Sequence, residues 1–418
     1  MTSVAERLAD KALAAAAAPD AAALRPLILT NLSAAVGATD GTERPLVAVV
    51  SGPDPASTAF RLAARMHVRT QDDFFPSGRV HVGAVVVPPV LALGTDNFWG
   101  AVAAGYAVFT VIAAAYSADC QDRGFRPSGI MGPPAAAAAA GVALGLSRDQ
   151  LAGAIAAAAT ASAGTNQAWV DGSGEWLLEV AHAARAGVEA AQLVDAGLPA
   201  AVGQGFEGRS GWGAAYFGDA GASRLVQQLD RGDQTYRVAT KPYPVSGIAQ
   251  VPTHLSALLG VKLGHQLPER MVVAMPARSL DYPGSRNRGP FRSRSDSLMS
   301  VARCCAVAYL SGYVSVNGLS APPSADEARL VEAIELVADD SAGPEGVTVT
   351  VEAGGTELAL HGDADELLYP TWDELRSDLA GLATRSEAAE ADVTAFAAAL
   401  DAEQVETRSL LARLEPSL

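Results

Sequence analysis

The sequence predicts a mainly α protein that combines a large all-helical domain with a smaller α+β domain. Ala- and Gly-rich helical segments dominate the first 260 residues, strand-like segments appear only after about residue 266, and helical spacing returns near the C-terminus. With 418 residues, of which 49% are hydrophobic and 18% are charged, the chain is too long for one ordinary core and too apolar to be disordered. We therefore expect two domains.

Small side chains characterise the predicted helices of the first domain, because Ala and Gly allow helix axes to approach closely. Ser147 is the expected N-cap of one helix, and Gly197 followed by Pro199 ends another. The predicted helices span Ala12–Leu32, Phe98–Ala118, Ala135–Leu146, Arg148–Gly164 and Leu177–Gly197.

The segment from residue 266 mixes strands and helices. Arg270–Ala277 predicts one strand, and Gly346–His361 predicts two strands around a Gly-Gly turn. Helices are expected between them, at Ser295–Leu310 and Ala325–Leu336, where apolar residues recur at helical spacing.

Two further helices are predicted at Ser386–Leu400 and Val405–Leu414, and we expect them to pack back onto the first domain. The predicted domain boundaries are therefore 1–265 with 385–418 for the helical domain and 266–384 for the α+β domain.

Composition excludes several classes of function. The formal net charge of -16 argues against a nucleic-acid partner, because such proteins carry basic patches that replace counterions. Three cysteines without a C-x-x-C pattern suggest neither a disulfide framework nor a zinc site. The N-terminal segment lacks the basic start of a secretory signal. We expect a cytoplasmic protein that does not bind nucleic acid.

One segment leaves a membrane location open. Phe98–Ala118 is uncharged and long enough to cross a bilayer. It is rich in Ala and Gly, and its flanks offer Asp96 and Asp119 but no Lys or Arg cluster that would set an orientation. We predict a buried core helix and no membrane partner.

Four segments in a fixed order resemble the MmgE/PrpD family, the lyases that include 2-methylcitrate dehydratase and cis-aconitate decarboxylase. "GFRPSGIMGPPAAAAAAGVALGLSRDQ", which begins at Gly124, is the most specific of them. The others are "DDFFPSGRVHVGAVVVPPVLALG" from Asp72, "AARAGVEAAQLVDAGLPA" with "FEGRSGWGAAYFGD", and "KPYPVSGIAQVPTH" from Lys241. The resemblance covers nearly the whole chain.

The resemblance implies that the α+β domain is a lid, that the chain forms a homodimer, and that the active site lies between the domains without a metal or cofactor. It also implies removal of a proton next to a carboxylate of a small carboxylated substrate. Such chemistry needs a base, an acid for a leaving group, and cations that absorb the developing negative charge.

Catalytic and binding roles follow from the matched positions. His81 falls on the family's catalytic histidine, and Asp72 and Asp73 match the end of its D-x-D-D run, which here starts at Thr70. Each of these three residues has an alternative interpretation as a helix cap. Lys241 matches the lysine of a K-x-F/Y-P segment that resembles a substrate-carboxylate contact, with a solvated lysine as the alternative.

Two matched positions belong to the segment at Gly124. Arg126 replaces a family histidine, so it could hold a carboxylate but could not transfer a proton at neutral pH. Ser128 matches a threonine and would donate a hydrogen bond to the substrate or cap a helix.

Other positions depart from the family pattern. Trp176 stands at a family lysine, Glu179 near a family histidine, Ser246 at a histidine of the decarboxylases and Arg303 at a tyrosine of the lid. Replacing a lysine by tryptophan suits a substrate with more hydrocarbon than methylcitrate. We expect Arg126, Lys241 and Arg303 to hold anionic groups, unless the arginine run in 285–296 does so.

These residues lead to a hypothesis of a lyase or isomerase, with specialised biosynthesis as one setting. Dehydration, decarboxylation and isomerisation share a carbanion, so the sequence does not choose among them. The alternative is a non-catalytic descendant that binds a metabolite or a partner protein, as altered site positions would allow.

Overall fold

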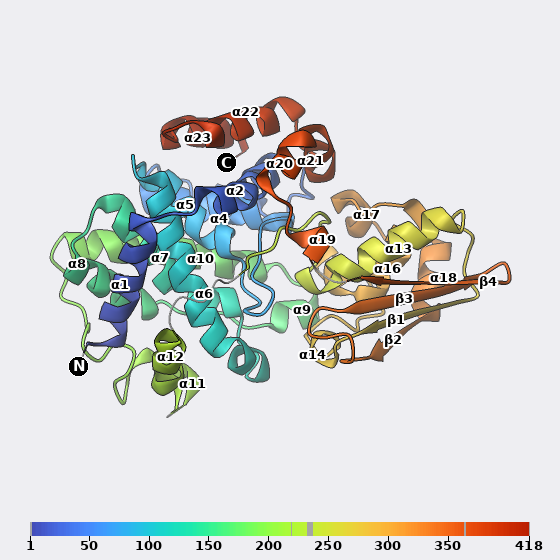
Figure 1. Cartoon of the computed structure of the whole chain (residues 1–418), viewed down its shortest axis with the longest axis horizontal. Coiled ribbons are helices and arrows are strands. Elements are labelled where there is room, and N and C mark those ends of the chain that lie inside the picture. The colour runs from blue at the N-terminus through green and yellow to red at the C-terminus, as the bar shows by residue number, and fades with distance from the viewer. Residues whose placement is uncertain (1, 219, 232–236, 363–364, 418) are drawn as a thin grey trace.

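The computed structural model describes residues 2–218, 220–231, 237–362 and 365–417. It confirms a mainly α protein with a smaller α+β part, and Figure 1 shows the two parts side by side. The first part contains α1 (Val4–Ala17), α2 (Ala21–Val36), α3 (Arg44–Val49), α4 (Pro55–Val68), α5 (Val82–Leu93), α6 (Phe98–Asp122), α7 (Pro127–Leu144), α8 (Arg148–Ala159), α9 (Gln167–Asp171), α10 (Glu175–Asp195), α11 (Trp212–Phe217) and α12 (Gly221–Asp230).

The centre of the helical domain is built from helices in close contact. A Cβ atom at Gly187 of α10 would lie 2.3 Å from Cβ of Ala136 on α7, so these two helices require glycine where they cross. The helix α6 is long and apolar enough to cross a membrane, but 78% of its most apolar window is buried inside the domain. It therefore serves as a core helix, as the sequence predicts.

Some predicted helices are interrupted. Ala12–Leu32 is not one helix, because α1 ends before Pro19 and Asp20 caps a new helix, accepting a hydrogen bond from the backbone of Ala23 at 3.1 Å. The pair α1 and α2 bends by 98°. The predicted helix Ser295–Leu310 likewise divides at Ser300 into α15 (Arg294–Met299) and α16 (Val301–Ser311).

The α+β part contains one four-stranded sheet in the order β2-β1-β3-β4. β1 (Arg270–Met275) runs parallel to β2 (Ile334–Ala338) and antiparallel to β3 (Val347–Ala353), which pairs with β4 (Thr356–Gly362). The sequence did not predict β2, because its residues continue the apolar pattern of the preceding helix α18 (Ala325–Ala333). Pairing with β1 draws them into the sheet.

Helices cover one face of this sheet. Leu255 and Leu259 of α13 (Gln250–Lys262) share an apolar core with Val301 of α16 and Val349 of β3. The predicted boundary at residue 266 falls after α13, whereas α13 packs on the sheet. The remaining helices of this part are η1 (Gly247–Ala249), α14 (Ala277–Leu280), α17 (Val316–Ser320) and α19 (Asp365–Leu368).

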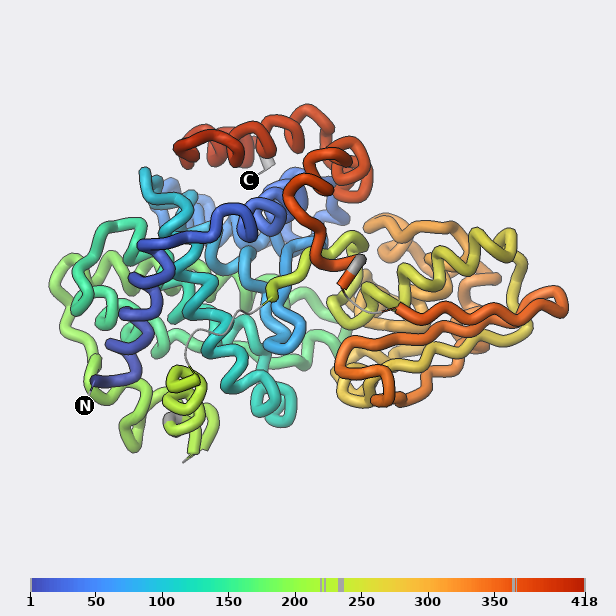
Figure 2. Tube along the Cα trace, in the orientation of Figure 1, coloured from blue at the N-terminus to red at the C-terminus, as the bar shows by residue number. Residues whose placement is uncertain are grey.

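The chain then returns to the helical domain, as Figure 2 shows. Phe396 is fully buried in the same core as the first helices. The returning elements are α20 (Trp372–Ser377), α21 (Leu379–Ser386), α22 (Glu390–Asp401), α23 (Thr407–Leu414) and η2 (Glu415–Ser417).

Candidate active site

A cavity of about 360 Å³ lies between the helical domain and the sheet. Three polar groups of its wall are His67 at the end of α4, His81 at the start of α5 and Arg126 at the start of α7. The opposite wall contributes the large side chains of Met275, Tyr282, Leu298 and Met299, together with the charged Arg278, Asp340 and Glu345.

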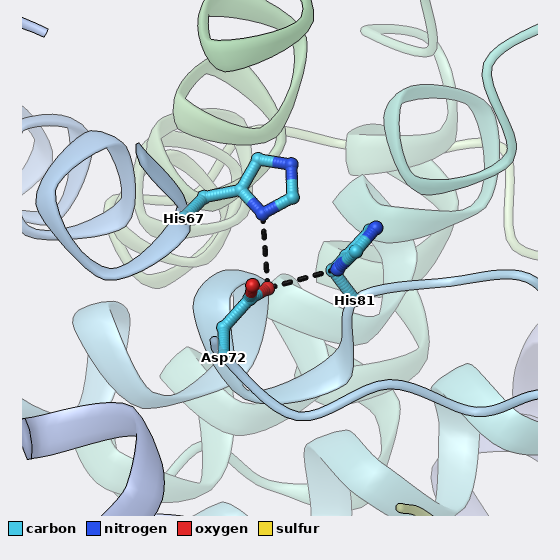
Figure 3. A group of neighbouring side chains, drawn as sticks. All are labelled: His67, Asp72 and His81. Carbon is cyan, nitrogen blue, oxygen red and sulfur yellow. Dashed lines mark hydrogen bonds and ion pairs between the residues drawn. The ribbon is translucent and has the colours of Figure 1, made fainter. Parts of the chain in front are cut away.

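Two histidines converge on one carboxylate at this cavity (Figure 3). Nδ1 of His67 and Nδ1 of His81 each lie 2.9 Å from Oδ2 of Asp72. The side chains of His67 and Asp72 are fully buried, whereas 13% of the His81 side chain is exposed. Of these three groups, His81 is therefore the one most open to a substrate.

Hydrogen bonds define which nitrogen of each ring carries the proton. Nη2 of Arg126 lies 3.2 Å from Nε2 of His67, and because a guanidinium only donates, this nitrogen accepts. Nδ1 of His67 therefore donates to Asp72. Nδ1 of His81 lies 2.9 Å from the same carboxylate and 3.2 Å from Nζ of Lys241, which already donates to Asp72 at 3.0 Å. We assign the proton of Nδ1 to the shorter contact with the carboxylate, which leaves Nε2 of His81 without a proton.

A buried lysine completes the group. Nζ of Lys241 lies 3.0 Å from Oδ1 of Asp72 and 3.2 Å from Nδ1 of His81, and its side chain is fully buried. The sequence predicted a substrate-carboxylate contact for Lys241. In the structure its partner is the protein's own carboxylate, and Lys241 is not part of the cavity wall.

The ionisation states follow from burial and from these charges. Burial alone would raise the pKa of Asp72, but the charge of Lys241 and the two imidazoles hold it well below its usual range. Burial and Lys241 hold the pKa of His81 well below its usual value. Burial lowers the pKa of His67 to about 4. At neutral pH both imidazoles are uncharged.

The start of α5 places His81. His81 occupies the N-cap position, but its ring makes no capping hydrogen bond and turns to Asp72 instead. Its backbone N–H donates to Oγ of Ser128 at 3.0 Å. Ser128 thus fixes His81 in the structure rather than reaching into the cavity.

Asp73 has a different environment from its neighbour. Its Oδ1 accepts from the backbone N–H of Gly83 at 2.6 Å, and its Oδ2 accepts from Asn31 and from the hydroxyl of Tyr106. Burial raises its pKa to about 6. Asp73 is fully buried and absent from the cavity wall, so it anchors the first turn of α5.

Arg126 presents a cation to the cavity and is held from three directions. Its guanidinium lies over the ring of Trp169 at 5.0 Å, contacts His67, and has Nε 3.7 Å from Oε2 of Glu179. Burial raises the pKa of Glu179 to about 7, although Arg126 opposes this. Arg126 is therefore a preorganised partner for a carboxylate.

The other predicted site residues divide between the cavity and its surroundings. Ser246 lines the cavity. Trp176 packs behind His67 with ring centroids 5.0 Å apart, and its Nε1 donates to Ser295 at 2.9 Å. Arg303 is buried on α16 and pairs with Glu327 at 2.9 Å. The cavity wall contains neither Trp176 nor Arg303.

The arginine run between 285 and 296 also binds within the protein. Arg288 donates to backbone carbonyls, and Arg294 pairs with Asp40 at 3.1 Å. No arginine of this run lines the cavity in the described residues. The sequence did not identify His67 or Trp169 as site residues, although His67 precedes the aspartate pair at the end of α4.

The histidine-aspartate group also has the donor atoms of a metal site. One ligand atom from each of His67, Asp72 and His81 lies within 4.8 Å of the others. However, Lys241 already contacts Asp72 and Arg126 contacts His67, so a divalent ion would sit beside two fixed cations. Repulsion at such distances in a buried site disfavours a metal here and favours a proton relay.

Comparison with known proteins identifies the family of the chain. The MmgE/PrpD N-terminal domain matches residues 4–225, a range that contains His67, Asp72, His81 and Arg126. No curated protein matches the chain. The chain belongs to the MmgE/PrpD family, whose known dehydratases support a lyase-type activity in general.

Proposed function

We propose that the chain is a cofactor-independent carbon-oxygen or carbon-carbon lyase, or an isomerase, that acts on a small carboxylated metabolite. The observation that carries this proposal is the unprotonated Nε2 of His81 beside a cavity that also presents Arg126. A base and a carboxylate-binding cation at one cavity are what proton removal next to a carboxylate needs.

His81 is the proposed base. Asp72 fixes its tautomer and stabilises the imidazolium that forms when Nε2 takes the proton. The pKa of His81 lies well below its usual value in the free protein. A bound substrate carboxylate would raise it, because a nearby negative charge favours the protonated ring. Substrate binding would therefore bring the base toward its working range.

Arg126 is the proposed partner of the reacting carboxylate. When the C–H bond breaks, its electron pair moves into the carboxylate as an enediolate, and the guanidinium stabilises the added charge through two parallel hydrogen bonds. Loss of a β-hydroxyl, which takes the proton held by His81 and leaves as water, then completes a dehydration. Return of the proton to another carbon or face completes an isomerisation. In a decarboxylation, loss of CO₂ forms the carbanion, and His81 would deliver to it a proton taken up from solvent.

The cavity wall supports a substrate other than 2-methylcitrate. Trp169, Leu298 and Met299 line it with apolar surface, which suits hydrocarbon rather than a third carboxylate. A new substrate on a family scaffold fits a role in specialised biosynthesis.

Proton exchange tests the proposal. The protein is incubated in heavy water with cis-aconitate, methylcitrate, itaconate, citramalate and simpler β-hydroxy or unsaturated acids, and deuterium uptake is followed by NMR. Uptake that disappears in His81→Ala would support carbanion chemistry and name a substrate class. Absence of uptake, together with tight binding of one of these acids, would favour the non-catalytic alternative.

Assembly and location are proposed on the resemblance and on composition. We propose a cytoplasmic homodimer, and the buried free thiols of Cys120, Cys304 and Cys305 fit a reducing compartment. Sedimentation velocity tests the dimer.

A further inference from the structure

A strained arginine stands at the cavity on the turn that precedes α5. Phe75 and Val80 form an antiparallel bridge, and Arg79 adopts φ 52° within the turn that they close. This left-handed region favours glycine, and a longer side chain usually persists there only where the surroundings or a function require it. The turn has no room to relax at Gly78, where a Cβ atom would lie 2.3 Å from the Phe75 ring.

The guanidinium of Arg79 crosses from the helical domain to the α+β part. It lies 5.0 Å from the ring centroid of Tyr282, and its Nη2 donates to the backbone carbonyl of Arg278 at 3.4 Å. Arg278 follows β1 on α14 and also lines the cavity. Its own hydrogen bonds are long and neutral, at 3.4 Å to Gln121 and 3.3 Å to Ser117.

In the described part of the chain, the hydrogen bonds of these two arginines go to a backbone carbonyl and to neutral side chains. Burial, together with the nearby charge of Arg278, lowers the pKa of Arg79 to about 10. Asp340 and Glu345 line the same cavity, and Oδ1 of Asp340 accepts a hydrogen bond from the backbone N–H of Ala277 at 3.1 Å.

The other two cations near the site each have a carboxyl group beside them. Lys241 is paired with Asp72, and Arg126 faces Glu179. Arg79 and Arg278 lie close together and repel each other. An anion bound between them would therefore interact favourably with both positive charges. The two cations belong to opposite sides of the cleft, so a group bound between them would contact both domains.

We propose that Arg79 and Arg278 form a second anion-binding subsite, which takes an acidic group at the end of the substrate remote from the reacting carboxylate. The inference rests on the proposed function only in assigning the reacting carboxylate to Arg126. Because Tyr282, Leu298 and Met299 line the same cavity, the substrate class is a diacid whose two acidic groups are joined by a largely apolar chain. A carboxylate or a phosphonate could serve as the second acidic group, because both are anions that accept hydrogen bonds from a guanidinium.

Calorimetry on the full chain tests the subsite without relying on turnover. His81→Ala protein is titrated with α,ω-dicarboxylates of four to eight carbons, with monocarboxylates of the same lengths, and with ω-phosphonocarboxylates. At least one diacid should bind about tenfold more tightly than its matched monoacid, as expected for a charged hydrogen-bonded contact. Comparing the carboxylate and phosphonate arms identifies which second group is preferred.

Variants then assign the gain to the two arginines. Arg79→Gly suits the left-handed backbone, so the melting temperature should not fall, and the preference for the diacid should disappear. Arg278→Ala should also remove it. Arg185→Ala, which breaks an exposed pair with Glu189, is the matched control and should keep it.

The inference is overturned if every diacid binds no better than its monoacid, if no diacid binds, or if both variants retain the preference. This outcome is distinct from failure of the proposed function. If the preference for the diacid depends on Arg79 but no substrate shows deuterium exchange, the subsite is retained and the proposed lyase or isomerase function is not supported. Deuterium exchange in the wild type, combined with a preference for the diacid that persists in Arg79→Gly and Arg278→Ala, would retain the proposed function and exclude the subsite.

Discussion

Nδ1 of His81 lies 2.9 Å from Oδ2 of Asp72, and this contact sets both the orientation and the tautomer of the one histidine in the group that is partly exposed. The carboxylate is itself held by Lys241 at 3.0 Å. A base that is oriented before the substrate arrives needs no rearrangement when the proton is transferred.

His81→Asn should abolish deuterium exchange with little loss of stability. Asparagine is a favoured N-cap residue, so α5 should still begin at Val82, while the base is lost. The expected fall in exchange rate is at least about 100-fold. His182→Asn, on the exposed side of α10, is the control for a histidine remote from the cavity. A large fall in melting temperature with activity retained would show that His81 is structural.

The adjacent aspartates should respond differently to the same substitution. Asp72→Asn should remove exchange, because a neutral amide does not stabilise an imidazolium and its NH₂ group would replace Oδ1 opposite the ammonium of Lys241. Asp73→Asn should lower the free energy of unfolding by about 1–3 kcal/mol and leave exchange per folded molecule largely intact, since Asp73 anchors α5. Measuring both the free energy of unfolding with denaturant and the exchange rate distinguishes the catalytic role of Asp72 from the structural role of Asp73. An equal loss of exchange in both variants would contradict this assignment.

Much of the helical domain could be predicted because its signals are local. Ser147 caps α8 through a capping box, and Gly354 and Gly355 turn β3 into β4, as their sequences indicate. The strand β2 could not be predicted, because its pairing partner β1 lies about sixty residues earlier and its own pattern continues a helix. Long-range pairing overrode local propensity there.

The site was harder to predict than the fold. Matched positions identified His81, Asp72 and Arg126, which the structure brings together. Lys241, which matches a family lysine, and Arg303, a cation at a lid position, were predicted to contact substrate. Each has an internal carboxylate partner that only the folded chain reveals. A buried cation is expected to be paired, so charge alone did not distinguish pairing within the protein from binding to a ligand.

Lys241→Met should shift the acid limb of the kcat/KM profile to higher pH. The charge of Lys241 lowers the pKa of His81, so its removal raises that pKa and the base becomes protonated at a higher pH. Breaking this buried pair should also lower the free energy of unfolding by about 3–5 kcal/mol. Lys241→Arg, which keeps the charge, is the control. An acid limb that stays at the wild-type position in Lys241→Met would exclude this role for Lys241.

His67 should make the protein less stable in mild acid. Its pKa is about 4 in the folded protein and near the ordinary value of 6.5 when unfolded, so between these values the unfolded chain binds more protons. Stability from this group is complete above pH 6.5 and falls as the pH drops toward 4, by up to about 3 kcal/mol.

The variant His67→Gln has no imidazole at this position, so it lacks this titration. All other ionisable residues of the chain are kept in the variant. Urea unfolding between pH 4.5 and 7.5 should therefore give a smaller loss of stability on acidification for the variant than for the wild type. Parallel pH dependences in the two proteins would mean that His67 titrates normally in the folded state.

Glu179 should make substrate binding depend on pH near neutrality. Its pKa is raised to about 7, and its Oε2 lies 3.7 Å from Nε of Arg126. Below pH 7 the protonated carboxyl leaves the guanidinium charge to the substrate, whereas above pH 7 the carboxylate competes for it. KM should therefore rise in the wild type as the pH increases through 7, and Glu179→Gln should flatten this rise. Glu189→Gln, an exposed change on the same helix, should keep the wild-type profile; an identical rise in Glu179→Gln would show that Glu179 does not control Arg126.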